Sequence, residues 1–129
     1  MITNFEAHTP PITENEIKIA ELVKSILKTR TESNPIFSEQ LQADVNYLNT
    51  TGTNITSARL RTIIHYLRVR EKLPIIGTSR GYYISNDIAE IQKQRRSLME
   101  RAMSIIEVAQ AFDEMEQNLL FDGLKIAEQ

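Results

Sequence analysis

The fold is indicated by two adjoining stretches, TSARLRTIIHYLR at residues 56–68 and IIGTSRGYYI at residues 75–84. In the first, apolar residues recur at the spacing of one face of an α-helix, at Leu60, Ile63, Ile64 and Leu67. In the second, two β-type runs flank Ser79-Arg80-Gly81, which is typical of a short hairpin. Pro74 lies between the stretches and predicts that the helix ends near residue 71 or 72, before the hairpin begins.

Two further helices are predicted upstream. Thr13-Glu14-Asn15-Glu16 fits a capping box and indicates a first helix from about Glu14 to Thr29. After a turn-rich segment at residues 30–35 and a short extended piece at residues 36–37, we expect Ser38 to cap a second helix that fades near Asn49. Gly52 in the next loop can take a positive φ, and Thr56 suits the N-cap of the third helix.

The resulting order is helix, short strand, helix, glycine loop, helix and hairpin, which is the layout of a winged helix-turn-helix. Residues 56–68 resemble the recognition helix of biotin-repressor-like winged-helix domains (helix-turn-helix type 11). Residues 77–84, GTSRGYYI, are similar to that family's wing, in which a Gly-Tyr pair leads into the second wing strand. The resemblance covers about Glu14 to Ile84, extends to small phage-encoded winged-helix proteins and implies a DNA-binding domain. The chain lacks the ligase or effector domain of the biotin repressor, so effector control is not implied.

The outward face of the third helix carries the predicted DNA contacts. If the apolar stripe faces the core, steps of about 100° per residue place Ala58, Arg61, Thr62, His65 and Val69 outward. Arginine pairs with guanine edges and threonine meets bases or phosphates, so we expect Arg61, Thr62 and His65 to read bases in a major groove.

Phosphate contacts are expected beside this face and at the hairpin tip. Ser57 lies in the first helical turn, where free amides attract anions, and Arg59 and Arg68 flank the outward face. Arg80 at the tip is expected to enter a minor groove or meet the backbone. The predicted DNA-contacting residues are therefore Ser57, Arg59, Arg61, Thr62, His65, Arg68 and Arg80.

Each assignment has an ordinary structural alternative. Arg59 and Arg68 can be solvated charges, or can pair with Glu71 or with an acid of the second helix. His65 can be an exposed histidine, and Arg80 can serve only the turn. Of Tyr82 and Tyr83, which alternate across the hairpin, one is expected in the core.

Charge is distributed unevenly along the chain. The net charge is −2, but residues 59–101 contain ten Lys or Arg and four Asp or Glu, which gives +6 and leaves −8 for the remainder. A basic segment inside an acidic chain favours a local surface that binds a polyanion, although solvated helix faces give the same pattern.

A long helix is predicted from Asp87 to about Gln117. Its apolar residues recur every seven positions, at Ile91, Leu98, Ile105, Phe112 and Leu119. Arg95 and Glu116 interrupt this seam. We interpret the helix as an assembly element that makes a homodimer or a larger oligomer; the alternative is that it folds back through Gly123. The predicted organisation is a flexible lead-in at residues 1–12, a winged helix-turn-helix at 13–85, and a long helix with tail at 86–129.

Composition excludes several classes of function. The chain contains no cysteine, and no apolar run reaches the roughly 18–20 residues of a membrane span. Because no leader-like segment opens the sequence, we expect a cytoplasmic protein. The family resemblance implies that the cell is a bacterium or a phage-infected host. Two histidines and no nucleotide-binding or metal motif favour a protein that is not an enzyme and needs no cofactor or metal.

Three functions remain open at this point. The first is a small phage or bacterial transcriptional regulator that binds double-stranded DNA as an oligomer. The second is a phage replication or packaging accessory that binds DNA to assemble other machinery. The third is a winged-helix adaptor that binds protein and not DNA, because a fold alone does not decide a function.

Overall fold

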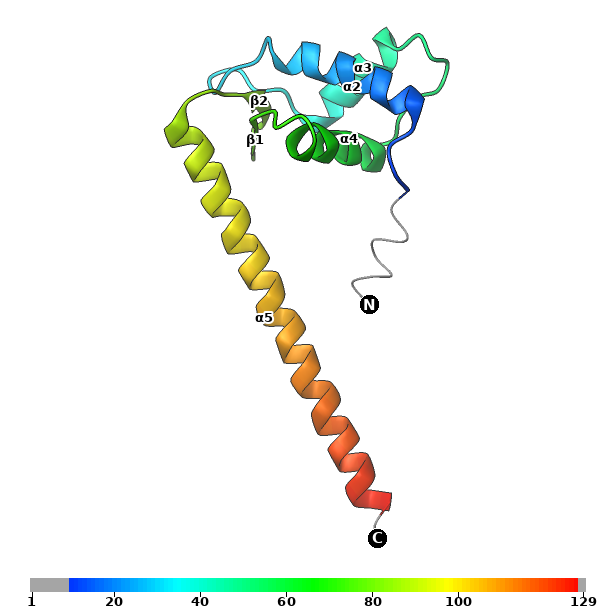
Figure 1. Ribbon diagram of the computed structural model, residues 1–129, viewed down its shortest axis with the longest axis vertical. Helices are drawn as coiled ribbons and strands as arrows, with labels where there is room; N and C mark the ends of the chain where they lie inside the picture. The colour runs from blue at the N-terminus through cyan, green and yellow to red at the C-terminus, as the bar shows by residue number, and fades with distance from the viewer. Residues whose placement is uncertain (1–9, 128–129) are drawn as a thin grey trace. The chain divides into compact units, whose positions relative to one another are not determined.

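A computed structural model describes residues 10–127, with side chains described as far as Gly123. Its elements, in order, are α2 (Glu14–Leu27), α3 (Ser38–Leu48), α4 (Ser57–Val69), β1 (Ile75–Thr78), β2 (Gly81–Ile84) and α5 (Ile88–Ala127), as Figure 1 shows. The predicted fold class, mainly helical with a small β-hairpin and a long C-terminal helix, is confirmed. Most of the predicted N-terminal lead-in, residues 1–9, lies outside the described residues.

The start of α2 is the predicted capping box. The amide of Glu16 donates to Thr13 Oγ1 at 3.2 Å, and the amide of Thr13 donates to Glu16 Oε1 at 3.0 Å. The prediction that Ser38 caps α3 is wrong: Phe37 occupies the N-cap position without a side-chain cap, and Ser38 is the first helical residue. The helix begins there because Ile36 is held extended by backbone hydrogen bonds to Tyr82.

The start of α4 also follows the sequence, whereas its end comes earlier than predicted. Thr56 is the N-cap, and its Oγ1 accepts from the amide of Arg59 at 3.2 Å. The helix ends at Val69 and not at residue 71 or 72. Lys72 then adopts φ = 55°, which turns the chain so that the amide of Leu73 donates to the carbonyl of Leu67 at 3.1 Å.

The hairpin is anchored to the loop before α3. Strands β1 and β2 are antiparallel, with Ile76 opposite Tyr83 and Thr78 opposite Gly81, so Gly81 belongs to β2 and the turn contains only Ser79 and Arg80. Ile36 adds a third row, because its amide donates to the carbonyl of Tyr82 at 2.9 Å and its carbonyl accepts from the amide of Tyr82 at 2.8 Å. The segment between α2 and α3 is thereby joined to the second strand of the hairpin.

One hydrophobic core joins the three short helices and the hairpin. Each helix turns an apolar side inward, although Leu48 at the end of α3, where an inward residue was expected, is exposed; α2 packs against both α3 and α4. The innermost side chains are Ile19, Val23, Leu27, Ile36, Leu41, Val45, Leu60, Ile63 and Leu67. Tyr83 is buried and Tyr82 is half-buried, which confirms that one of the two tyrosines belongs to the core. The α4 stripe is therefore committed to the core, and the opposite side of α4 is left to solvent.

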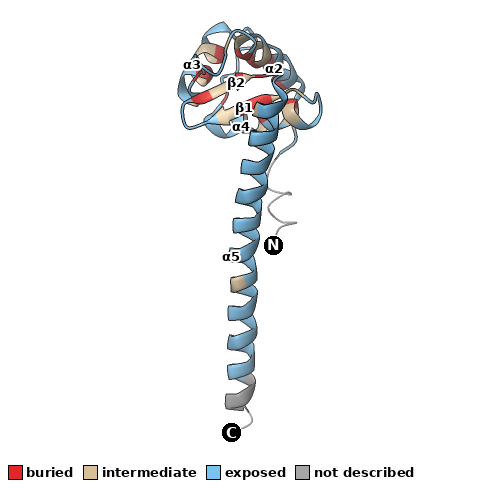
Figure 2. Cartoon of the chain, turned by 90° about the vertical axis from the view of Figure 1, so that its left-hand side faces the viewer, coloured by how far each residue is buried: buried red, intermediate tan, exposed pale blue. Residues whose placement is uncertain are grey.

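Helix α5 is longer than the sequence indicated. It continues ten residues beyond the predicted end at Gln117, and Gly123 lies inside it, so the described chain does not fold back at that glycine. The contacts divide the chain after Ile91, and Gln92 begins the second unit. Nearly all described side chains of that unit are exposed, as the pale blue helix of Figure 2 shows.

Candidate nucleic-acid interface

The exposed side of α4 is the candidate contact surface. We call the residues Ala58, Arg61, Thr62, His65 and Val69 the α4 outer face; four of them are exposed and Thr62 is half-buried. They point away from the core because Leu60, Ile63, Ile64 and Leu67 occupy the opposite side of the helix. Helix α4 contains no Asp or Glu. The outer face therefore carries positive charge without a local acid to neutralise it.

The structure leaves Arg61 and His65 available for a ligand. Both are exposed, and neither has a hydrogen bond or an ion pair to any residue that the structure describes. Thr62 Oγ1 donates to the carbonyl of Ala58 at 3.2 Å, which leaves its oxygen lone pairs as acceptors. Ser57 is exposed at the first helical position, beside the free amides of the α4 N-terminus. Ser57, Arg61, Thr62 and His65 therefore keep polar groups that are not used up by contacts within the described part of the chain.

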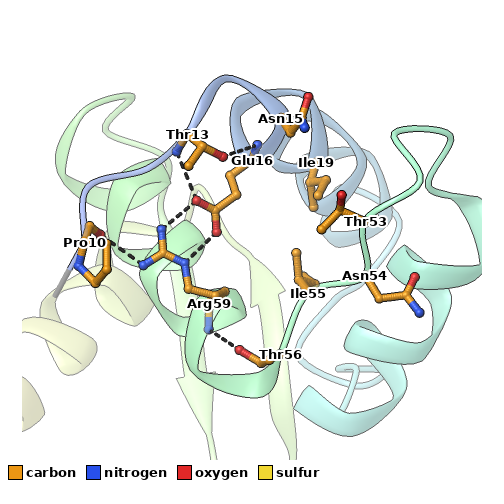
Figure 3. Close-up of a pocket in the computed structure, with 10 residues that line it drawn as sticks. All are labelled: Pro10, Thr13, Asn15, Glu16, Ile19, Thr53, Asn54, Ile55, Thr56 and Arg59. Atoms are coloured by element: carbon orange, nitrogen blue, oxygen red, sulfur yellow. Dashed lines mark hydrogen bonds and ion pairs between the residues drawn. The ribbon is translucent and has the colours of Figure 1, made fainter.

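Arg59 is placed differently from its prediction as a phosphate contact. Its guanidinium forms two hydrogen bonds with the Glu16 carboxylate, from Nε to Oε2 and from Nη2 to Oε1, both at 2.6 Å (Figure 3). It also donates to the carbonyls of Pro10 at 3.0 Å and Pro11 at 3.1 Å. With four of its N–H groups used inside the domain, Arg59 joins α4 to the start of α2, and we leave it out of the contact surface. Arg59 therefore forms an ion pair, as the alternative interpretation allowed, but its partner Glu16 belongs to α2, the first helix, and not to the second helix.

The Arg59–Glu16 ion pair is largely buried and holds the Glu16 carboxylate in its charged form. Only 10% of the Glu16 side chain and 23% of the Arg59 side chain are exposed. The hydrogen bonds from Arg59 lower the pKa of Glu16 to about 2, against the opposing effect of burial and with help from Thr13. The same carboxylate therefore closes the capping box and neutralises the Arg59 charge. It also places Arg59 in the wall of the pocket that Figure 3 shows, between the start of α2 and residues 53–56.

Arg68 connects α4 to the hairpin. Its Nε donates to the carbonyl of Ile75 at 3.0 Å. A Cβ placed on Gly77 would lie 3.3 Å from Arg68 Nη2 and 3.2 Å from the Tyr82 ring, so both groups lie over this glycine. Glu71, one of the partners considered for Arg68, instead accepts from Lys24 Nζ at 2.6 Å. Arg68 therefore positions the hairpin against α4, and the positive charge of its guanidinium lies beside the hairpin.

Arg80 lies in the turn of the hairpin, whose backbone is held by hydrogen bonds to a threonine side chain. Thr78 Oγ1 accepts from the amide of Arg80 at 3.1 Å and donates to the carbonyl of Gly81 at 3.2 Å. The Arg80 side chain is exposed and has no partner among the described residues. The backbone of the tip is thus held while its cation remains free, which suits a contact with a polyanion.

Two basic residues near the end of α4 received no role in the sequence analysis. Arg70 is the C-cap of α4 and is exposed, and exposed Lys72 donates from Nζ to the carbonyl of Val69 at 2.8 Å. With them, residues 57–84 hold six Lys or Arg and one acid, whereas residues 14–56 hold four Lys or Arg and six acids. The basic segment of the sequence was the signal that could have identified both residues.

Among the side chains that the structure describes, no three His, Cys, Asp or Glu residues gather in a way that could hold a metal ion. None of the helices in the described ranges has the length and apolar character that a membrane span requires. Comparisons with protein-family models, with curated proteins and with solved structures gave no match.

Proposed function

We propose that this protein binds double-stranded DNA through the α4 outer face and the tip of the hairpin. The observation that carries the proposal is the exposed, acid-free outer face, on which Arg61 and His65 have no partner among the described residues. The free cation of Arg80 at the hairpin tip supports it. A helix of this kind fits a major groove, and an arginine on a projecting turn reaches a phosphate or a minor groove.

The charge pattern and the order of the elements favour the same function. Residues 57–84 carry a net charge of +5, from six basic residues and one acid, while residues 14–56 carry −2. Three helices followed by a hairpin is also the arrangement to which the sequence resemblance points. We infer a small bacterial or phage transcriptional regulator that acts by occupying DNA or recruiting partners to it, with no bond made or broken, and that assembles through α5.

Selection of bound DNA from a random-sequence duplex library, at two salt concentrations, tests this proposal. An enriched motif that persists at the higher salt is the expected result, because base contacts depend less on salt than phosphate contacts do. Salt-sensitive binding without a motif would indicate a replication or packaging accessory. Absence of binding at both salt concentrations would indicate the protein-binding adaptor and would overturn the proposal.

Charge reversal locates the contact surface. Arg61→Glu and Arg80→Glu should each lower the affinity for duplex DNA by at least about tenfold, because each replaces a cation that attracts the DNA polyanion by an anion that it repels. Lys18→Glu is the matched control, since Lys18 is exposed on α2 at a position that turns away from the core. If the control weakens binding as much as the two test variants do, the surface assigned to α4 and the hairpin is wrong.

A further inference from the structure

Helix α5 presents an apolar stripe to solvent. Its large residues recur at seven-residue intervals and are 41–72% exposed, at Leu98, Ile105, Phe112 and Leu119. Ala102 and Ala109 lie between them on the same side of the helix. Exposed apolar residues in such a row favour a helical partner that covers them, and small residues in the row let a partner approach closely.

Two charged residues interrupt the stripe, and they have opposite signs. Arg95 precedes Leu98 by three positions and Glu116 follows Phe112 by four, so both lie on the face that a partner helix would cover. The midpoint between them falls between Ile105 and Ile106. A two-fold axis at that midpoint, perpendicular to α5, would bring Arg95 of one chain level with Glu116 of a second chain. By symmetry, Glu116 of the first chain would lie level with Arg95 of the second.

The other charged residues at positions 92–123 of α5 are distributed in the same way, with mainly basic residues in the first half and acidic residues in the second half. Residues 92–106 contain the basic residues Lys93, Arg95, Arg96 and Arg101 and a single acid, Glu100. Residues 107–123 contain five acids and no Lys or Arg, the acids being Glu107, Asp113, Glu114, Glu116 and Asp122. A second copy in parallel orientation would place basic half against basic half and acidic half against acidic half. A second copy in antiparallel orientation places opposite charges together along the helix.

We propose that a second copy of this chain covers the stripe, with the two α5 helices antiparallel and crossing near Ile105 and Ile106. Burial of the apolar row drives the association, and the Arg95–Glu116 pairs select the orientation, because like charges in a covered seam are unfavourable. This inference rests on the proposed self-association through α5 and is independent of DNA binding. Its consequence is that the two N-terminal units are attached at opposite ends of the paired helices.

Distances between single labels distinguish the two orientations. The chain contains no cysteine, so Ser97→Cys in the full-length protein gives one spin-label site, next to the stripe but not in it. In the antiparallel pair, Ser97 of one chain and Ser97 of its partner are separated by about 25 Å along the axis, from a rise of 1.5 Å per residue. In a parallel pair the two positions lie at the same level, within about 10 Å of one another.

Analytical ultracentrifugation without DNA measures the mass of the assembly. Double electron–electron resonance on the labelled protein then measures the distance between the two labels. We expect the mass of two chains and the longer distance. The mass of a single chain overturns both the self-association and the orientation, and a mass above that of two chains overturns the proposed pair. A dimer with the shorter distance overturns only the orientation. Neither result bears on DNA binding, which the library selection measures separately.

Charge exchange gives a second and independent readout. Arg95→Glu or Glu116→Arg alone should weaken the dimer by about tenfold, since each turns two attractive pairs into two repulsive ones. The double variant Arg95→Glu/Glu116→Arg should recover the original dissociation constant to within about threefold. In a parallel dimer a single exchange replaces one like-charged pair by another, so unchanged single variants would contradict the proposal. Lys18→Glu, outside α5, is the control for net charge.

Discussion

The guanidinium of Arg59 and the carboxylate of Glu16 face each other with two hydrogen bonds of 2.6 Å, across 43 residues of sequence. This contact links the first turn of α4 to the first turn of α2. Since the same carboxylate also accepts the amide of Thr13, one side chain closes a helix cap and fixes the angle between two helices. The pair thereby holds α4 in place while its outer face remains open to solvent.

The first prediction concerns this pair. Glu16→Gln should lower the free energy of unfolding by about 2–3 kcal/mol at pH 7, because the pKa of Glu16 falls from an ordinary 4.5 to about 2 on folding. A lowered carboxyl pKa stabilises the fold above pH 4.5, and this stabilisation is lost as the pH falls from 4.5 towards 2. Urea unfolding at several pH values should therefore show the two proteins converging near pH 2. Glu14→Gln, an exposed first-turn control, should change stability by less than about 0.5 kcal/mol, and a constant difference at all pH values would contradict the prediction.

A second prediction compares two glycines of positive φ. Gly81→Ala should destabilise the domain by about 3 kcal/mol or more, because φ is 127° and a Cβ would lie 2.3 Å from the carbonyl oxygen of Ile36. Gly52→Ala should cost only about 1 kcal/mol, since φ is 83° and no atom lies within 4 Å of the new Cβ. Thermal unfolding of both variants measures the contrast. Equal losses would mean that the contact with Ile36 contributes nothing beyond backbone strain.

The third prediction separates a contact residue from a positioning residue. Arg61→Ala should leave stability within about 0.5 kcal/mol of the original, because Arg61 has no partner among the described residues. As the loss of a base contact, it should weaken binding to the selected DNA motif by about 1–3 kcal/mol and relax the preference at one base position. Arg68→Ala should lower stability by about 1–2 kcal/mol and also weaken DNA binding, since it removes the hydrogen bond that ties α4 to Ile75. Denaturant unfolding measures the stabilities, and binding titrations with the selected motif and with single-base variants of it measure the affinities. Loss of stability in Arg61→Ala would show that the residue supports the fold.

A fourth prediction concerns the buried tyrosine of the hairpin. Burial and the hydrogen bond from its hydroxyl to Glu90 Oε1 at 3.2 Å raise the pKa of Tyr83 to about 12. A raised pKa means that the stabilisation is complete below pH 10 and is lost as the pH rises through 12. The difference between ultraviolet titrations of the original protein and Tyr83→Phe isolates this group. A midpoint of the difference curve near 10 would show that Tyr83 is not buried as described.

Local signals in the sequence predicted most of the elements. The capping box at Thr13 and Glu16, the N-cap at Thr56 and the positive φ at Gly52 all depend on residues at most a few positions apart. The predicted helix boundaries were wrong where a distant strand fixed the boundary or where no residue of the sequence marks it. Ile36 is held by Tyr82, which makes Phe37 and not Ser38 the N-cap of α3, and no strong stop signal marks the end of α5 before residue 127.

The sequence by itself determined which way the α4 side chains point, because the helical period follows from the apolar pattern alone. It therefore identified Arg61 and His65 as outward residues. Only the tertiary structure decided what each flanking arginine contacts: Arg59 turns to Glu16, and Arg68 to the hairpin. A helical wheel gives the direction of a side chain but not what lies there. The neighbour depends on how loops bring remote segments together, and that is set by the packing of the whole core.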